Sequence, residues 1–120
     1  MEKPELLSPL SLAFVGDAVY SLWVREAEVM LGGNIGTLHS ASVKKVNAAA
    51  QAKAAEKIRP LLSEQEEAVF KRGRNTQTGT GAKGATRAEY HMATGLEALF
   101  GWLYLSGQID RARELFDVAF

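Results

Sequence analysis

Cysteine is absent from the chain, which excludes disulfide bonds and metal sites built on thiolates. The two histidines, His39 and His91, lie too far apart in sequence to form a histidine pair on one helix, so nothing indicates a zinc centre. No apolar stretch approaches the ~20 uncharged residues that a membrane-spanning helix requires. The first ten residues, MEKPELLSPL, also lack the pattern of a secretory signal. We therefore expect a cytoplasmic protein with no membrane helix.

Runs of β-branched residues that alternate with polar ones are also missing, so the sequence predicts no sheet. The 120 residues are 47% hydrophobic and 23% charged, which is typical of a globular protein with one core. Neither an internal repeat nor a domain linker divides them. The expected fold is a single all-α domain over residues 1–120.

Helix start and stop signals divide this domain. Ser8 and Pro9 provide the cap and first position of a helix that should end at Leu31, before two glycines. The polar segment 75–85, NTQTGTGAKGA, should be a mobile loop, and its G-x-G-x-x-G pattern is no dinucleotide fingerprint because no strand precedes it. Between these two segments the signals predict a short helix from a cap at Thr37 through Lys45 and an alanine-rich helix (VNAAAQAKAAEKI) ended by Pro60. A capping box of Ser63 and Glu66 opens the next helix. Two last helices are predicted over 86–106, where Gly107 stops the first, and over about 108–119.

Two acidic residues stand alone in apolar surroundings. Asp17 is the only charged residue in LSLAFVGDAVYSLWV, and Glu97 is the only formally charged residue in YHMATGLEALFGWLYLSGQI. Burying an ionised carboxylate costs several kcal/mol unless a cation, a hydrogen-bonding shell or a metal compensates its charge. Neither run contains a fixed cation, so something outside each run must meet the charge.

A lone acid of this kind can also face solvent or bond a distant arginine, and for a single residue that is the commoner outcome. Here each acid is accompanied by a glycine, Gly16 directly before Asp17 and Gly95 two residues before Glu97. This coincidence favours a shared site of oxygen ligands.

Fourteen basic residues balance fourteen acidic ones, but the charges are unevenly distributed. The segments 29–55 and 71–88 contain bases and no Asp or Glu. Within the second, KRGRN at 71–75 would either complement the dipole at a helix end or place guanidinium groups where they suit phosphates, and the two interpretations are equally supported. Such segments indicate a nucleic-acid surface, although a solvated face is the commoner role of any single one.

The sequence around both acids resembles the ribonuclease III endonuclease domain. LAFVGDAVY is similar to that family's signature, an apolar helix with a Gly-Asp step, and GLEALFGWLYLSG is similar to its second acidic helix. HSASVKKVNAAAQAKA, EEAVFKRGRN and the glycine-bearing loop resemble the compact subclass called Mini-III. The resemblance covers nearly the whole chain. It implies the helical ribonuclease III fold as a homodimer, without the double-stranded-RNA-binding domain of the full-length enzymes.

By this resemblance, Asp17 and Glu97 are catalytic, metal-binding acids, and Phe14 lies at the dimer interface. Two further acids of the ordinary family pattern are absent, because Ala13 and Thr94 occupy their positions, as in Mini-III. The implied cofactor is Mg²⁺, held by hard carboxylate oxygens and completed by waters and RNA phosphates. The number of ions at each site stays open.

The implied function is magnesium-dependent endonucleolytic cleavage of double-stranded RNA, and the implied substrate is the bacterial 23S ribosomal RNA precursor. Whether a large-subunit ribosomal protein takes part as a partner stays open. A-form RNA is recognised through phosphates and 2′-hydroxyls, which requires dispersed cations and polar side chains. The candidates for RNA contact are Lys44, Lys45, Arg72, Arg74, Asn75, Lys83 and Arg87.

Two other functions fit parts of the sequence. The two missing acids would also suit a catalytically silent module that binds double-stranded RNA or assists ribosome assembly on the same fold. Zero net charge and abundant apolar residues would suit a helical dimer that only binds other proteins. Cleavage that depends on magnesium and binding that weakens with salt separate the three hypotheses.

Overall fold

The computed structural model describes residues 3–38, 47–76 and 86–120, and every regular element in these ranges is helical. The all-α prediction is therefore confirmed for the described part of the chain. In chain order the elements are the short 3-10 helix η1 (Pro4–Leu6), α1 (Pro9–Leu31), α3 (Ala48–Ile58), the short 3-10 helix η2 (Arg59–Leu61), α4 (Glu64–Arg74), α5 (Arg87–Leu105) and α6 (Ile109–Ala119).

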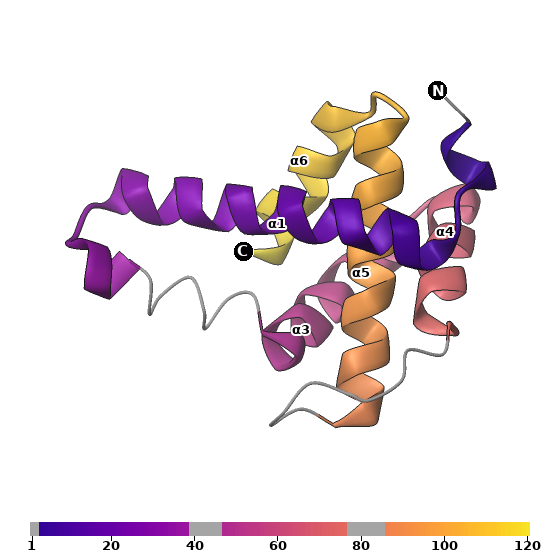
Figure 1. Ribbon diagram of the computed structural model, residues 1–120, viewed down its shortest axis with the longest axis horizontal. Helices are drawn as coiled ribbons and strands as arrows, with labels where there is room; N and C mark the ends of the chain where they lie inside the picture. Colours follow the sequence, from indigo (N-terminus) through magenta and orange to yellow (C-terminus); the bar gives the residue numbers. More distant parts are fainter. Residues whose placement is uncertain (1–2, 39–46, 77–85) are drawn as a thin grey trace.

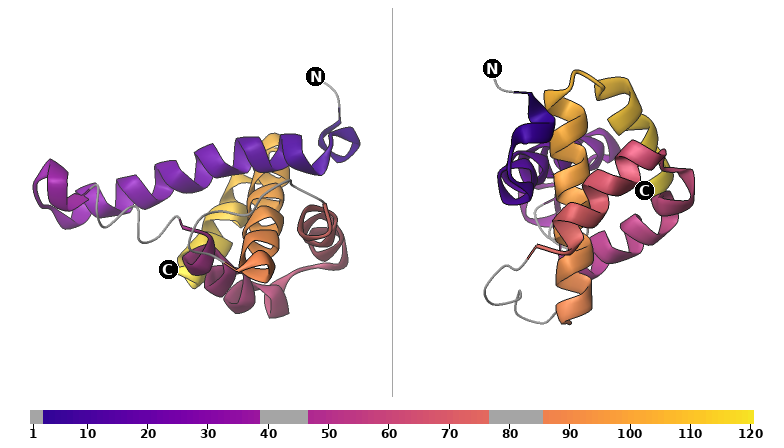
Figure 2. Two further views of the ribbon diagram at one scale, coloured as in Figure 1. Left: turned by 60° about the horizontal axis from the view of Figure 1, so that its bottom comes forward. Right: turned by 90° about the vertical axis from the view of Figure 1, so that its right-hand side faces the viewer.

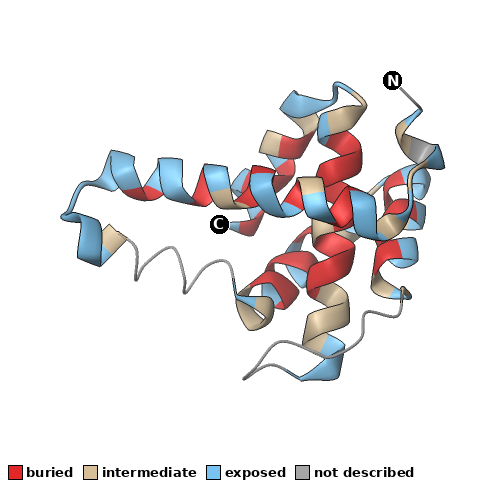
Figure 3. Ribbon diagram, in the orientation of Figure 1, coloured by how far each residue is buried: buried red, intermediate tan, exposed pale blue. Residues whose placement is uncertain are grey.

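Helix α5 is the central element. It runs through the middle of the molecule, with α1 across one side and α3, α4 and α6 packed around it (Figures 1 and 2). The sequence explains this position, because residues 93–103 are apolar or glycine except for Thr94 and Glu97. A helix that is apolar on every side must be covered on every side. Residues 93–103 of α5 are accordingly all buried except the half-buried Glu97, while the other helices keep an exposed face (Figure 3).

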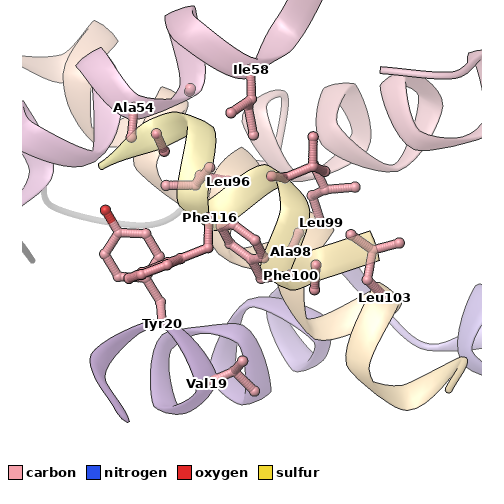
Figure 4. Packing of buried hydrophobic residues seen from close by; sticks show 14 of the residues in the cluster. Val19, Tyr20, Ala54, Ile58, Leu96, Ala98, Leu99, Phe100, Leu103 and Phe116 are labelled. Atoms are coloured by element: carbon pink, nitrogen blue, oxygen red, sulfur yellow. The ribbon is translucent and has the colours of Figure 1, made fainter. Parts of the chain in front are cut away.

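Aromatic rings of α1, α5 and α6 meet in the core (Figure 4). Tyr20 of α1 contacts Phe100 of α5 and Phe116 of α6, with ring centroids 5.7 and 5.8 Å apart. Such ring pairs contribute about 0.5–1.5 kcal/mol each beyond the burial of their area. These contacts fix α1 against α5 and thereby fix the position of residues near Tyr20.

Most of the predicted helix signals are confirmed. Ser8 Oγ accepts a hydrogen bond from the Ser11 backbone N–H at the start of α1. Both hydrogen bonds of the capping box between Ser63 and Glu66 are present at the start of α4. Gly107, with a φ of 77°, follows the end of α5. The other helices in the described ranges begin and end within two residues of the predicted bounds.

The cap predicted at Thr37 is wrong. Residues 35–38 are helical, and the cap is Asn34, whose Oδ1 accepts a 2.9 Å hydrogen bond from the Thr37 backbone N–H. Asparagine is at least as good a cap as threonine, so the turn begins directly after Gly33. The remainder of the helix predicted through Lys45 and most of the loop predicted over 75–85 lie outside the described residues.

The C-terminal end of α1 projects beyond the body of the molecule (Figures 1 and 2). Val29, Met30 and Leu31 at this end of α1, and Ile35 just after it, are each exposed by 61 to 82%. Despite these apolar residues, none of the helices in the described ranges combines the length and the apolar content needed to cross a membrane.

Candidate active site

Two glycines allow α1 and α5 to cross in direct backbone contact. A Cβ atom built on Gly16 would lie 1.7 Å from the backbone oxygen of Glu97, and one built on Gly101 would lie 1.9 Å from the backbone oxygen of Leu12. No residue with a side chain fits at either position unless the helices separate. This crossing brings Asp17, the residue after Gly16, next to Glu97.

Asp17 and Glu97 form a pair of carboxyl groups at the crossing, which we call the acid pair. Asp17 is exposed, Glu97 is half-buried, and the two side chains are hydrogen-bonded. Burial, the hydrogen bond to Asp17 and the charge of Asp17 together raise the pKa of Glu97 from 4.5 to about 8. Glu97 therefore holds a proton at neutral pH, which it donates to Asp17.

No cation among the described residues forms an ion pair with either member of the acid pair. The lysine and arginine side chains that form ion pairs in the described ranges do so with Glu26, Glu66, Glu67 and Glu114. The group that contacts each acid from outside its own apolar run is therefore the other acid. Two adjacent carboxylates repel one another when both are ionised, and a divalent cation between them would remove that repulsion.

Two further polar side chains lie near Glu97. Gln51 of α3 interacts with the Glu97 carboxyl and lowers its pKa, which opposes the effect of burial. Tyr20 of α1 is fully buried, and burial together with the charge of Glu97 raises the pKa of its hydroxyl. The sequence analysis identified neither residue, because Tyr20 is one of several aromatics in an apolar run and Gln51 lies in an alanine-rich helix.

Gly95, which the sequence analysis placed with Glu97, belongs to a different contact. A Cβ on Gly95 would lie 2.9 Å from the backbone oxygen of Phe70, and one on Gly73 would lie 2.7 Å from Ala98 Cβ, so these glycines let α4 approach α5. The glycine missed at the acid pair is Gly101. The sequence did contain a signal for Gly101. A glycine inside a helix costs about 1 kcal/mol relative to alanine, which indicates that a close packing contact needs it there.

The positions of the two absent acids are both buried. Ala13 is packed in the core, and the Thr94 hydroxyl donates a 3.1 Å hydrogen bond to the backbone oxygen of Tyr90. Across residues 3–38, 47–76 and 86–120, no group of three or more His, Cys, Asp and Glu side chains could hold a metal ion. The acid pair thus offers two protein carboxylates.

Four of the seven candidates for RNA contact lie in the described residues, and none of them has a recorded contact there with the acid pair. Arg74 and Asn75, at the end of α4, are joined by a 3.1 Å hydrogen bond from Arg74 Nε to Asn75 Oδ1. Arg72 donates to a backbone oxygen near the N-terminus at 3.4 Å. Arg87 is exposed in the first turn of α5, ten residues or roughly 15 Å along the helix from Glu97. The other candidates, Lys44, Lys45 and Lys83, lie outside the described residues.

Phe14 lies one turn before Asp17 on α1 and is 83% exposed. Leu10 and Leu22 are exposed too, and a spacing of four and eight residues places the three side chains near one face of the helix. This apolar face borders the acid pair.

A helical fold that brings two isolated carboxyl groups together at its central crossing offers hard oxygen ligands of the kind that metal-dependent nucleases use. The sequence model of the Ribonuclease III domain matches residues 10–108, a span that contains both acids. The chain belongs to the ribonuclease III family, and it is an endoribonuclease specific for double-stranded RNA.

The curated relatives place the chain within that family. It is 45% identical over 114 residues to the Mini-ribonuclease 3 of Thermoanaerobacter sp., covering 94% of this chain and 80% of that protein. It is 42% identical over 120 residues to the Mini-ribonuclease 3 of Symbiobacterium thermophilum, covering 99% and 92%. The X-ray crystal structure of a protein from Fusobacterium nucleatum superposes with a TM-score of 0.89 at 33% identity, covering 98% of this chain and 95% of that one. The resemblance to Mini-III seen in the sequence is thereby confirmed.

Proposed function

We propose that the acid pair is the catalytic centre of a magnesium-dependent endoribonuclease, with Asp17 and Glu97 as the metal-binding residues. The observation that carries this proposal is the crossing at Gly16 and Gly101, which brings two isolated acids from opposite ends of the chain into hydrogen-bonding contact. A strongly raised pKa beside a second carboxyl group is typical of a functional site.

The residues present fit a hard divalent cation. Both side chains offer carboxylate oxygens, which Mg²⁺ prefers, and no described lysine or arginine competes for them. Two protein ligands leave most of an octahedral shell to waters and RNA phosphate oxygens. We therefore expect weak metal binding in the absence of RNA.

Magnesium, when bound, would supply charge stabilisation at the phosphodiester and an activated water. The chain's own contribution is to place the two carboxylates. Asp17 is exposed and is the acid that the RNA backbone can approach, whereas Glu97 is half-buried and fixed by the packing of α5. Because no histidine lies in contact with the acid pair among the described residues, we assign no protein base.

The substrate class follows from the family and from the distribution of cations. We propose that Arg72, Arg74 and Asn75, at the C-terminal end of α4, and Arg87, at the N-terminal end of α5, contact RNA phosphates together with Lys44, Lys45 and Lys83. Similarity to bacterial Mini-ribonuclease 3 proteins supports the 23S ribosomal RNA precursor as the natural substrate, processed in the cytoplasm by this single domain. A large-subunit ribosomal protein is a candidate partner for presenting that RNA.

We also propose a homodimer in which Phe14 packs against the partner subunit. The apolar face of Leu10, Phe14 and Leu22 supports this arrangement, because an exposed phenylalanine between two exposed leucines is unfavourable in water. Since the face borders the acid pair, covering it with a second copy would set two sites side by side, one for each RNA strand.

The test is cleavage of a long RNA duplex with and without Mg²⁺ by the natural chain, Asp17→Asn and Glu97→Gln. We expect magnesium-dependent cleavage that either substitution abolishes while urea unfolding remains cooperative. Intact duplex together with salt-sensitive binding would instead identify the catalytically silent RNA-binding module, which the two buried non-acidic positions, Ala13 and Thr94, would explain.

A further inference from the structure

Gln51 of α3 is a buried polar side chain in an otherwise apolar contact. It is 3% exposed, and its neighbours Ala52, Ala54 and Ala55 are also buried. Its side-chain Nε2 makes no hydrogen bond with any described residue. A buried amide without a partner is unfavourable, and an apolar side chain of similar size would remove that penalty. Folding alone therefore gives no reason for glutamine at this position.

The same side chain lies beside Glu97. Helix α3 packs against α5, and the Gln51 amide lowers the pKa of the Glu97 carboxyl, which is the effect of an N–H donor facing a carboxylate oxygen. The position of Gln51 is well fixed, because Asn47 caps α3 one turn earlier by accepting a 2.8 Å hydrogen bond from the Ala50 backbone N–H. The donor therefore comes from an anchored helix.

We propose that Gln51 is a positioning residue of the active site. Its amide N–H, which has no partner in the metal-free protein, donates to one oxygen of Glu97 once a divalent cation has ionised that carboxyl group, and keeps the other oxygen directed toward Asp17 and the cation. This inference rests on the proposed function. Partners that hydrogen-bond a metal-binding carboxylate orient it, and their loss typically lowers metal affinity about 10–100-fold. With only two protein carboxylates at the site, the orientation of each has a large effect on binding.

The test replaces the amide with an apolar side chain of similar length, Gln51→Met, and uses Gln65→Met as the matched control. Gln65 is exposed on α4. Binding of Mn²⁺ without RNA is measured from the electron paramagnetic resonance signal of the free ion. We expect Gln51→Met to bind Mn²⁺ about tenfold more weakly than the natural chain, as a lost carboxylate partner would, and Gln65→Met to bind it equally well.

Two further readouts separate positioning from a purely structural role. In EDTA, Gln51→Met should unfold at a urea concentration no lower than the natural chain, because it loses an unpartnered buried amide. On duplex RNA, the Mg²⁺ concentration for half-maximal cleavage should rise about tenfold, while the rate at saturating Mg²⁺ falls less. A packing defect would lower stability and leave the metal requirement unchanged.

A second measurement needs no folded variant. In the ¹⁵N-labelled natural chain, a trace of Mn²⁺ should broaden the side-chain amide signals of Gln51 and leave those of Gln65 sharp. Equal Mn²⁺ affinities for the natural chain and Gln51→Met, or unbroadened Gln51 signals, would overturn the role of Gln51 and leave the proposed function standing. A natural chain that neither binds Mn²⁺ nor cleaves duplex RNA would overturn the proposed function, and this inference with it.

Discussion

Replacing Glu97 with glutamine should stabilise the metal-free protein at neutral and alkaline pH. Glutamine keeps the size of the side chain and cannot ionise. The pKa of Glu97 is about 8 in the folded protein against an ordinary value of 4.5, so the folded state holds a proton that the unfolded chain has released. The free energy of unfolding of the natural chain must therefore fall as pH rises from 4.5 to about 8, and the loss persists above that range.

The magnitude follows from the same two values. One pH unit corresponds to about 1.4 kcal/mol for one proton, so the whole range from 4.5 to 8 carries at most roughly 5 kcal/mol. Between pH 5 and pH 8 the Glu97→Gln variant should gain roughly 4 kcal/mol on the natural chain. A domain of this size is stabilised by only about 5–15 kcal/mol in total. The effect is therefore large enough to measure.

The assay is urea unfolding in EDTA from pH 5 to pH 9, with each variant compared with the natural chain at every pH. Asp17→Asn is the informative control, because it removes the charge beside Glu97 and leaves the burial, which is the larger cause of the raised pKa. Its curve should fall with pH less steeply than that of the natural chain. Parallel curves for the natural chain and Glu97→Gln between pH 5 and pH 8 would refute the account of the acid pair.

Three other predictions concern the crossing, the fold and the RNA surface. Gly101→Ala places a Cβ atom 1.9 Å from the Leu12 backbone oxygen and should cost about 3 kcal/mol in urea unfolding and abolish cleavage with both acids intact. Hydrogen bonds from Arg111 hold the pKa of Glu66 below its ordinary value, so stability should be lost as pH falls below about 4.5, and Glu66→Gln should cost about 3 kcal/mol at pH 7 and flatten this acid limb. Arg74→Ala and Arg87→Ala should each weaken binding of duplex RNA in EDTA and reduce the slope of log affinity against log salt by about one.

Each of these changes has a matched control. Gly36→Ala adds a Cβ atom whose nearest contact is 3.4 Å away and should leave cleavage unchanged. Glu114→Gln removes an exposed partner of the same Arg111 and should cost well under 1 kcal/mol. Arg113→Ala removes a cation that already forms an ion pair with Glu26 and lies over the Trp23 ring. The slope of log affinity against log salt for this variant should therefore match that of the natural chain. An unchanged salt slope for both Arg74→Ala and Arg87→Ala would rule out their phosphate contacts.

The helices and the two acids could be predicted from the sequence because their signals are local. A cap such as Ser63 with Glu66, or an acid isolated in an apolar run, is visible within one segment. Thr37 failed as a cap because Asn34, three residues earlier, competes for the same role and the sequence does not rank them.

The shell around Glu97 could not be predicted, because it depends on which helices touch. Gln51 looks like an ordinary polar position of an alanine-rich helix until α3 is packed on α5. Gly95 and Gly101 stand on the same helix, two residues before and four residues after Glu97, and only the packing shows that the first faces α4 and the second faces α1. Spacing along the chain shows which glycines and polar residues could lie near Glu97, whereas only the contacts between helices show which of them do.

Three features near Glu97 each lower the stability of the fold. The Glu97 carboxyl opposes folding above pH 4.5, the Gln51 amide is buried without a partner, and Gly101 replaces a better helix former. An apolar residue at 97, a methionine at 51 and a wider crossing with alanine at 101 would suit a helical core better. Together these substitutions would remove the second acid, its donor and the contact with Asp17. The convergence of three unfavourable choices on one crossing supports the proposed metal site, because a Glu97 carboxylate that was free to relax would not be held in place for a cation.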